Sequence, residues 1–187
     1  LGEYNLYTFE GAANTKLSEN VAIRGAFYSE DRDGFAENLA TGKSYGDVDK
    51  KSYRLQILAK LTDNTDALLK LHSRTYNGNG SNGSLAVGKY WGIYDAPDSR
   101  DANVDLNESG KIDNDGASLT LNSKIGDLNF TSISAIDQTK QLSFTDGDST
   151  PYDVSRSYAN NEWKQFTQEI RLASDASKPF SWIAGAH

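Results

Sequence analysis

Apolar and polar residues alternate with a period of two along most of the chain. In the run 53–61 the odd positions are apolar, while the even positions include Arg54, Gln56 and Lys60. Similar runs occupy 7–13, 21–27 and 67–72, and less regular ones occupy 118–122, 128–136, 165–172 and 180–186. Because successive residues of a β-strand point to opposite faces, each run predicts a strand with one apolar and one polar face. The pattern predicts eight strands.

Short and long polar segments alternate between these runs. The short ones are 17–20, 62–65, 124–127 and 174–179, and they are built from residues that favour turns. The long ones are about 29–51, 77–116 and 138–164. Such long connections are uncommon in compact domains but typical of one end of outer-membrane barrels. We therefore predict an all-β fold, an antiparallel transmembrane β-barrel, seen in part as four hairpins with short periplasmic turns and long extracellular loops.

The same alternation predicts which side chains share a face. A lysine or arginine facing the lipid costs about 2–4 kcal/mol at the bilayer midplane. We therefore expect the apolar set on the outer face, namely Val21, Ile23, Phe27, Leu55, Ile57, Leu69 and Leu71. The charged set is expected on the inner face, namely Arg24, Arg54, Lys60 and Lys70.

Composition narrows the function classes. The chain has 187 residues, no cysteine and two histidines, His72 and His187, which excludes disulfides and multi-histidine zinc sites. The net charge of −7 argues against nucleic acid as a partner. No nucleophile–base signature is present, so we expect no enzymatic activity. Because the chain opens on Leu1 and closes on an apolar run, we expect it to be an internal piece of a longer polypeptide.

Two segments resemble a known family. The early segment has LSENVAIR at 17–24, YSEDRDGF at 28–35 and Glu37-Asn38. The later one has FTQEIRLAS at 166–174 followed by FSWIAG at 180–185. Both are similar to barrel hairpins of TonB-dependent outer-membrane receptors, and they occur in the expected order and spacing.

The resemblance implies a barrel of about 22 strands filled by an N-terminal plug. Residues 1–187 would be part of that barrel, while the plug and the C-terminal strands lie outside this sequence. The implied function is active uptake of a scarce ligand, such as an iron chelate, cobalamin or an oligosaccharide, across the outer membrane of a Gram-negative bacterium. The implied partners are the TonB energy-coupling complex, through regions outside this sequence, the membrane lipid and the ligand.

One acidic stretch has the beginning of a calcium loop. Oxygen donors lie at the expected spacing, while a glycine replaces the glutamate usual at position 12; the candidate ligands are Asp105, Asn107, Ser109, the Lys111 carbonyl and Asp113. A solvated extracellular loop would have the same composition. We expect no required cofactor, with Ca²⁺ as a candidate ligand of this loop.

Candidate ligand-binding residues lie in one long loop and on the inner face. The loop offers the aromatic rings of Tyr90, Trp91 and Tyr94, and the inner face offers the charges of Arg54 and Arg171. Two other functions remain open. One is a complete small eight-stranded outer-membrane barrel with a structural or adhesive role, and the other is a secreted calcium-binding β-sandwich module.

Overall fold

The computed structural model describes residues 2–79, 89–90, 94–95, 101–177 and 179–187, which form strands, turns and loops with no helix. The strands are β1 (Tyr7–Lys16), β2 (Val21–Arg32), β3 (Ala36–Asn38), β4 (Lys43–Tyr45), β5 (Val48–Thr62), β6 (Thr65–Gly78), β7 (Lys89–Tyr90), β8 (Tyr94–Asp95), β9 (Ser109–Ile125), β10 (Leu128–Asp146), β11 (Arg156–Ser174) and β12 (Ile183–Ala186). The described part of the chain contains no helix with the length and hydropathy needed to cross a membrane.

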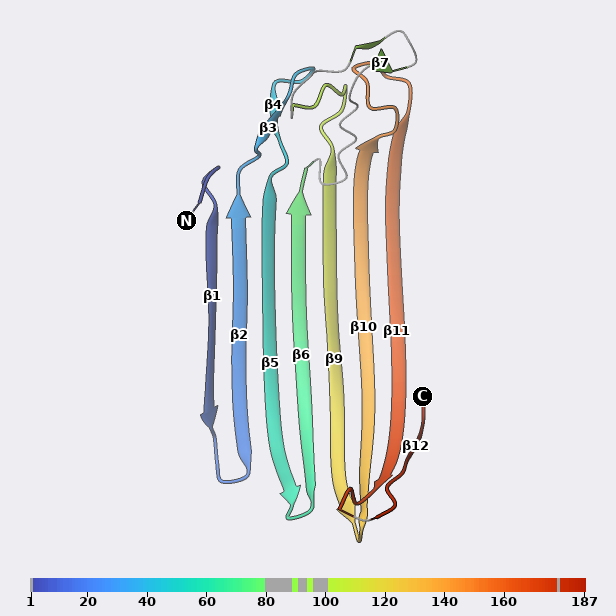
Figure 1. Ribbon diagram of the computed structural model, residues 1–187. Helices are drawn as coiled ribbons and strands as arrows, with labels where there is room; N and C mark the ends of the chain where they lie inside the picture. The colour runs from blue at the N-terminus through green and yellow to red at the C-terminus, as the bar shows by residue number, and fades with distance from the viewer. Residues whose placement is uncertain (1, 80–88, 91–93, 96–100, 178) are drawn as a thin grey trace.

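Eight of the strands form one antiparallel sheet. Its order is β1-β2-β5-β6-β9-β10-β11-β12, so spatial neighbours are also neighbours along the chain once the loop strands are set aside (Figure 1). The four hairpins are β1–β2, β5–β6, β9–β10 and β11–β12. The prediction of an all-β antiparallel fold built from four hairpins is confirmed. β3–β4 and β7–β8 form two separate two-stranded ladders inside the long loops.

Three of the hairpins close through tight turns where the sequence predicts them, at 17–20, 63–64 and 126–127. Gly126 has a φ of +61° at the first position of its two-residue turn. A glycine there adopts this conformation without steric cost, and such a turn matches the twist of the flanking strands. The fourth hairpin closes through a longer connection, residues 175–182.

The strands are longer, and one loop is much shorter, than the sequence predicts. β10 and β11 have 19 residues each, and only residues 147–155 connect them. The expected loop at 138–164 is therefore wrong. Thr139, Lys140 and Gln141 pair with β9 and β11 on both sides, which satisfies their backbone groups. Polar side chains do not end a strand whose backbone hydrogen bonds continue, because a strand surface can face water.

The register confirms the predicted division of faces. Val21, Ala59, Ala67 and Leu121 are cross-strand neighbours, as are Ile23, Ile57, Leu69 and Leu119. We call the side of the sheet that carries these residues the apolar face. Arg24, Arg54 and Lys70 lie on the opposite side, the polar face, with His72. On the apolar face, the apolar band comprises 21–27 of β2, 53–59 of β5, 65–71 of β6, 117–125 of β9, 128–136 of β10 and 166–172 of β11.

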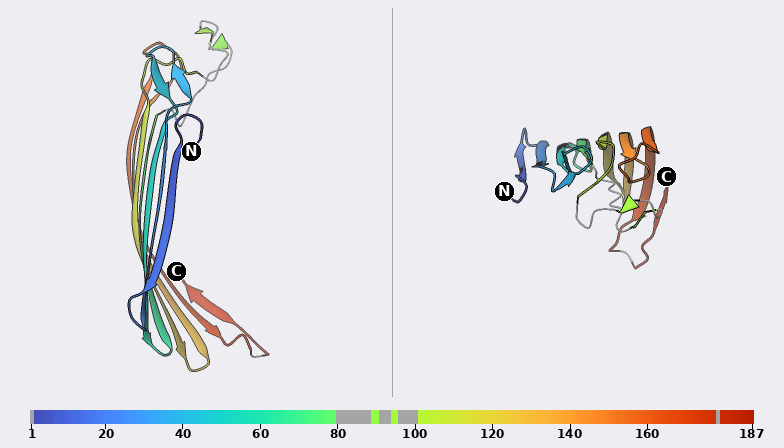
Figure 2. Two further views of the ribbon diagram at one scale, coloured as in Figure 1. Left: turned by 90° about the vertical axis from the view of Figure 1, so that its left-hand side faces the viewer. Right: turned by 90° about the horizontal axis from the view of Figure 1, so that it is seen from above.

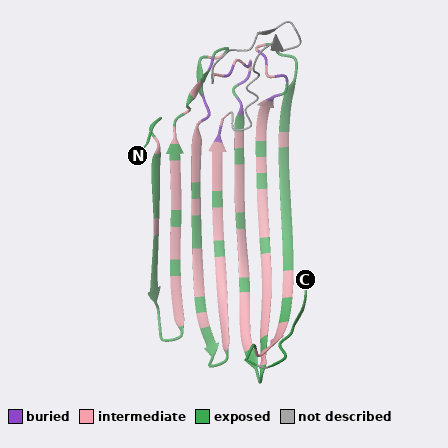
Figure 3. Cartoon of the chain, in the orientation of Figure 1, coloured by how far each residue is buried: buried purple, intermediate pink, exposed green. Residues whose placement is uncertain are grey.

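The sheet is curved and open (Figure 2). In the described residues β1 does not pair with β12, and β12 pairs with only four residues of β11. The described strands alone therefore form no closed barrel, and their place in a larger one stays a prediction. Buried residues lie only in the loops and strand ends at one end of the sheet, among the residues whose burial is described (Figure 3). In the described residues, the sheet is therefore not stabilised by a conventional hydrophobic core packed between two layers.

Candidate functional site

Two predicted ligand-binding arginines lie on the polar face, in different surroundings. Arg54 is the cross-strand neighbour of Ala26 and His72, and it has no hydrogen bond or ion pair with any described residue. Its guanidinium can therefore meet an anionic group from outside the sheet. Arg171 donates from Nη2 to Glu169 Oε2 at 2.8 Å. Its charge is already balanced, so Arg54 is the stronger candidate.

A polar cluster surrounds Gly116 on the same face. His72 Nε2 lies 3.5 Å from Asp137 Oδ1 across the strand that carries the glycine. Asn114 Nδ2 donates to Asp137 Oδ1 at 2.8 Å and to Thr139 Oγ1 at 2.9 Å. A Cβ at Gly116 would lie 2.4 Å from His72 Cε1 and 2.7 Å from Asp137 Oδ2. The absence of a side chain at Gly116 thus allows the histidine and the carboxylate to meet.

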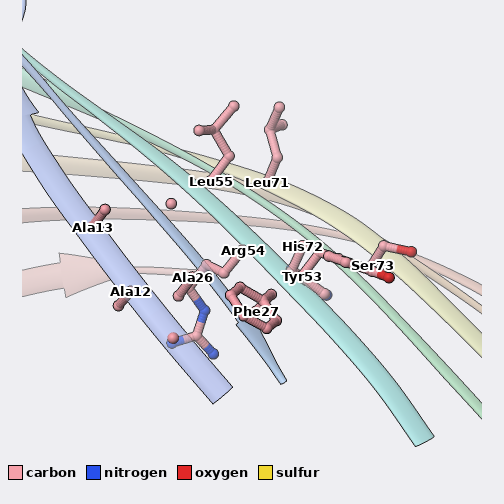
Figure 4. A pocket seen from close by; sticks show the side chains of 12 residues that line it. Ala12, Ala13, Ala26, Phe27, Tyr53, Arg54, Leu55, Leu71, His72 and Ser73 are labelled. Atoms are coloured by element: carbon pink, nitrogen blue, oxygen red, sulfur yellow. The ribbon is translucent and has the colours of Figure 1, made fainter. Parts of the chain in front are cut away.

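The apolar face has a different surface. A shallow hollow of about 750 Å³ lies across β1, β2, β5 and β6, with little polar lining (Figure 4). Leu55 and Leu71 point to one side of the sheet there, and the guanidinium of Arg54 points to the other. A Cβ at Gly11 would come within 2.8 Å of the Phe27 ring, so this glycine lets the ring lie across β1. Such a surface suits hydrocarbon chains better than a polar ligand.

Three polar residues on the apolar face satisfy one another. Ser134 Oγ donates to Gln168 Oε1 at 2.5 Å, and Gln168 Nε2 donates to Ser132 Oγ at 3.0 Å. Their register places them beside Leu119 and Leu121. Because unpaired polar groups are costly in an apolar medium, this internal pairing makes the polar patch compatible with the rest of the band.

Three loop segments pack together at one end of the sheet, and we call them the loop layer: 33–47, 101–108 and 147–155. Asn38 is 1% exposed and is the centre of the contact between the first two. Its Nδ2 donates to the Leu106 carbonyl at 3.1 Å, and its Oδ1 accepts from the Val104 amide at 3.2 Å. Ala102 and Val104 pack with Tyr45 beside it. One buried amide therefore holds two loops that are far apart in sequence.

A group of buried acids joins the loop layer to the ends of β9 and β10. We call Asp105, Glu108, Asp146 and Asp148 the carboxylate cluster. Glu108 accepts the hydroxyl of Tyr45 and, at 2.9 Å, the amide of Asp146. Burial, together with the bond to Glu108, raises the pKa of the Tyr45 hydroxyl, so Tyr45 stays a donor. Burial also raises the pKa of the Asp146 carboxyl, and the nearby charges of Asp148 and Asp105 add to this effect.

The predicted calcium ligands do not surround one point. Ser109, Lys111 and Asp113 belong to the extended strand β9, whose alternate side chains stand about 7 Å apart along one face. Lys111 Nζ pairs with Asp113 at 2.9 Å, and Asp105 pairs with Arg156 at 2.7 Å. No three His, Cys, Asp or Glu side chains of the described residues gather as a ready-made metal centre.

The predicted aromatic binding residues are only partly described. Tyr90 and Tyr94 are backbone partners in the small β7–β8 ladder. Trp91 lies outside the described residues. Their role in ligand binding stays a prediction.

Sequence reasoning missed Asn38, Tyr45, Asp146, Asp148 and Gly116. The segment 146–150, Asp-Gly-Asp-Ser-Thr, consists of acids, glycine and hydroxyl residues, a composition that signals local side-chain-to-backbone bonding. The segment falls within 138–164, for which the sequence predicts one long loop, so its own bonding does not stand out. Gly116 had no local signal, because its role depends on cross-strand neighbours. Comparison of the chain with family models, with curated proteins and with solved structures gives no match.

Proposed function

We propose that this chain is part of the barrel of a TonB-dependent outer-membrane receptor that takes up a scarce ligand. The observation that carries the proposal is the apolar band, which no other described layer covers. Large apolar side chains on it are well exposed, among them Tyr53, Leu71, Ile136 and Phe166. A continuous exposed apolar surface of this kind marks contact with a membrane or another protein.

The height of the band fits a bilayer. On β9 it runs over nine residues, 117–125, which span about 27 Å at about 3.4 Å per residue. Strands in outer-membrane barrels tilt by about 35–45°, which reduces this to roughly 19–22 Å, close to the band of about 25 Å found in that class. Above the band the same face becomes charged, with ion pairs Lys51–Asp49 and Lys111–Asp113. This change supports a boundary between lipid and water.

The open edges of the sheet support further strands at both sides. From Arg156 to Glu169, β11 has a partner on one side only, and so does β1. Lipid cannot hydrogen-bond a free strand edge, so a sheet in a bilayer has to close. In this proposal neighbouring strands of the same polypeptide complete the barrel, the polar face lines its interior, and Arg54 meets the plug or the ligand.

The test uses the full-length protein in its native host. A deletion strain is grown with an iron chelate, cobalamin or an oligosaccharide as the limiting nutrient, and a strain with the energy-coupling complex inactivated is grown beside it. We expect the two strains to lose uptake of the same ligand, and the protein to fractionate with the outer membrane. Unchanged uptake of all three ligand classes would refute the transport role, while a cytoplasmic or secreted protein would refute the membrane role as well.

A complete eight-stranded barrel is the second candidate, and the presence of eight main strands in one sheet favours it. That reading requires β1 to pair with β12, although β12 has four residues and β1 has ten. Cross-linking of cysteines introduced at Phe9 and Ala184, whose side chains both lie on the apolar side of the sheet, distinguishes the eight-stranded barrel from a larger one. A bond formed in the membrane-embedded protein would support the eight-stranded barrel and contradict a larger one.

A further inference from the structure

The carboxylate cluster has two oxygen atoms without a partner. The other oxygens accept hydrogen bonds: both of Glu108, both of Asp148, Oδ1 of Asp146 and Oδ2 of Asp105. Asp146 Oδ2 and Asp105 Oδ1 are buried and accept none. Buried polar atoms nearly always have a partner, so an orphan of this kind indicates a missing ion or water.

Both residues with orphan oxygens are neighbours of Arg156, Asp105 through the arginine side chain and Asp146 through the strand register. Arg156 Nη2 donates to Asp105 Oδ2 at 2.7 Å, and Arg156 is the cross-strand partner of Asp146. The side chain of Asp105 is 14% exposed, and Asp146 is 6% exposed. In each carboxylate, the oxygen that accepts a hydrogen bond holds the group in place, namely Oδ2 of Asp105 and Oδ1 of Asp146. The second oxygen of each carboxylate is left free.

The charge of the cluster is not balanced. Asp105, Glu108, Asp146 and Asp148 carry up to four negative charges, and Arg156 is the one cation paired with them in the described residues. Buried carboxylates are normally paired with a cation or a metal. Hard divalent cations prefer carboxylate and carbonyl oxygens.

We propose that the loop layer contains a Ca²⁺ site, with Asp105 Oδ1 and Asp146 Oδ2 as its two anionic ligands. Backbone carbonyls and water have to complete the shell, because no three His, Cys, Asp or Glu side chains of the described residues gather at one point. The ion would join the segment 101–108 to the end of β10. With two charged ligands it is expected to be a weak extracellular site, with a dissociation constant of about 10⁻⁴–10⁻³ M.

The test is calorimetric titration of the full-length, chelator-treated protein in detergent with CaCl₂ and, separately, MgCl₂. The variants are Asp105→Asn and Asp146→Asn, which keep the shape and remove the charge. Glu37→Gln is the matched control, because Glu37 is an exposed carboxylate of the same layer. We expect one Ca²⁺ per chain, a dissociation constant raised at least about tenfold in each variant, since even loss of a partner of a metal ligand costs about 10–100-fold, and an unchanged control.

Hydrogen exchange of the unmutated protein tests the proposal even if the variants fail to fold. Ca²⁺ should slow exchange in residues 101–108 and 146–155, and it should leave the turns at the far end of the sheet unchanged. Two results would overturn the proposal: no heat of binding at Ca²⁺ concentrations well above about 10⁻³ M, or hydrogen-exchange rates that are the same with and without Ca²⁺. Either result would mean that water or a proton satisfies the two oxygens. A Kd that both variants leave unchanged would overturn it too. This result is independent of the transport proposal.

Discussion

Leu68 and Leu69 provide a direct test of the two faces, because they are the same residue at neighbouring positions of β6 on opposite faces. Leu69 lies between Ile57 and Leu119 in the middle of the apolar band. Leu68 lies between Leu58 and Thr120 on the polar face. Arginine at the first position would enter hydrocarbon, while arginine at the second would enter a polar environment.

The expected cost of Leu69→Arg is about 2–4 kcal/mol, the range for arginine at the bilayer midplane. This corresponds to a loss of about 30- to 900-fold in the folding equilibrium. Leu68→Arg should cost less than about 1 kcal/mol, as for a surface substitution. The cost should fall with height along the same face of β6, from Leu69 through Leu71 to about 0–1 kcal/mol at Ser73, which lies above the band.

The assay is reversible urea unfolding of the full-length protein in phospholipid vesicles, followed by tryptophan fluorescence. Equal costs for the two leucines would refute the assignment of the faces. Leu69→Ala separates lipid from a covering protein layer, as in a β-sandwich. Fluid hydrocarbon fills the space left by the missing side chain, so only the transfer free energy of the lost carbons, about 2 kcal/mol, should be missing. A packed core adds the cost of a cavity and would lose up to about 5 kcal/mol.

Three further predictions concern the polar cluster and the loop layer. Gly116→Val should destabilise the protein by about 1–3 kcal/mol through overpacking, whereas Gly25→Ala, with no atom within 4 Å of its Cβ, should be neutral in urea unfolding. Tyr45→Phe leaves the Oε2 atom of buried Glu108 without a donor and should cost about 1–3 kcal/mol, seen as faster hydrogen exchange in 101–108; unchanged exchange would contradict it. Because its pKa is raised, Asp146 binds a proton more tightly in the folded layer than in the unfolded chain. Without Ca²⁺, the loop layer should therefore lose protection against hydrogen exchange as the pH rises from 3.8 through the raised pKa of Asp146. The charged groups around Asp146 are Asp105, Glu108, Asp148 and Arg156. Protection that increases over this pH range would contradict the raised pKa.

The sequence was sufficient for the strands of the apolar band and for their faces. Arg54 and Leu55, or Lys70 and Leu71, differ in polarity, and period two assigns each to a side without reference to any neighbour. The same reasoning failed for residues 138–146 and 156–164. There both faces meet water, so polarity no longer distinguishes strand from loop, and only the pairing with β9 and between β10 and β11 reveals the strands.

The candidate sites were predicted less well, because their contacts join distant parts of the chain. Asn38 reaches Leu106 over 68 positions, and Tyr45 reaches Glu108 over 63. No spacing rule connects such residues. For Asp105 the sequence suggests neighbours in its own segment, while the structure places it beside Arg156 at the start of β11.

The distribution of burial connects the fold to its proposed environment. In a water-soluble domain apolar side chains are the buried ones, yet here Phe9 and Phe166, on the apolar side of the sheet, are about 70% exposed, while Asn38, Glu108 and Asp146 are nearly inaccessible. This inversion is unstable in water alone, because the apolar area would drive association. It becomes consistent if hydrocarbon covers the band and water covers the loop layer. The two regions then depend on different interactions: the band on the lipid, and the loop layer on hydrogen bonds and charge. Replacing lipid by detergent should therefore change the free energy of unfolding of the sheet. It should leave unchanged the hydrogen exchange of the Val104 amide, which donates to Asn38.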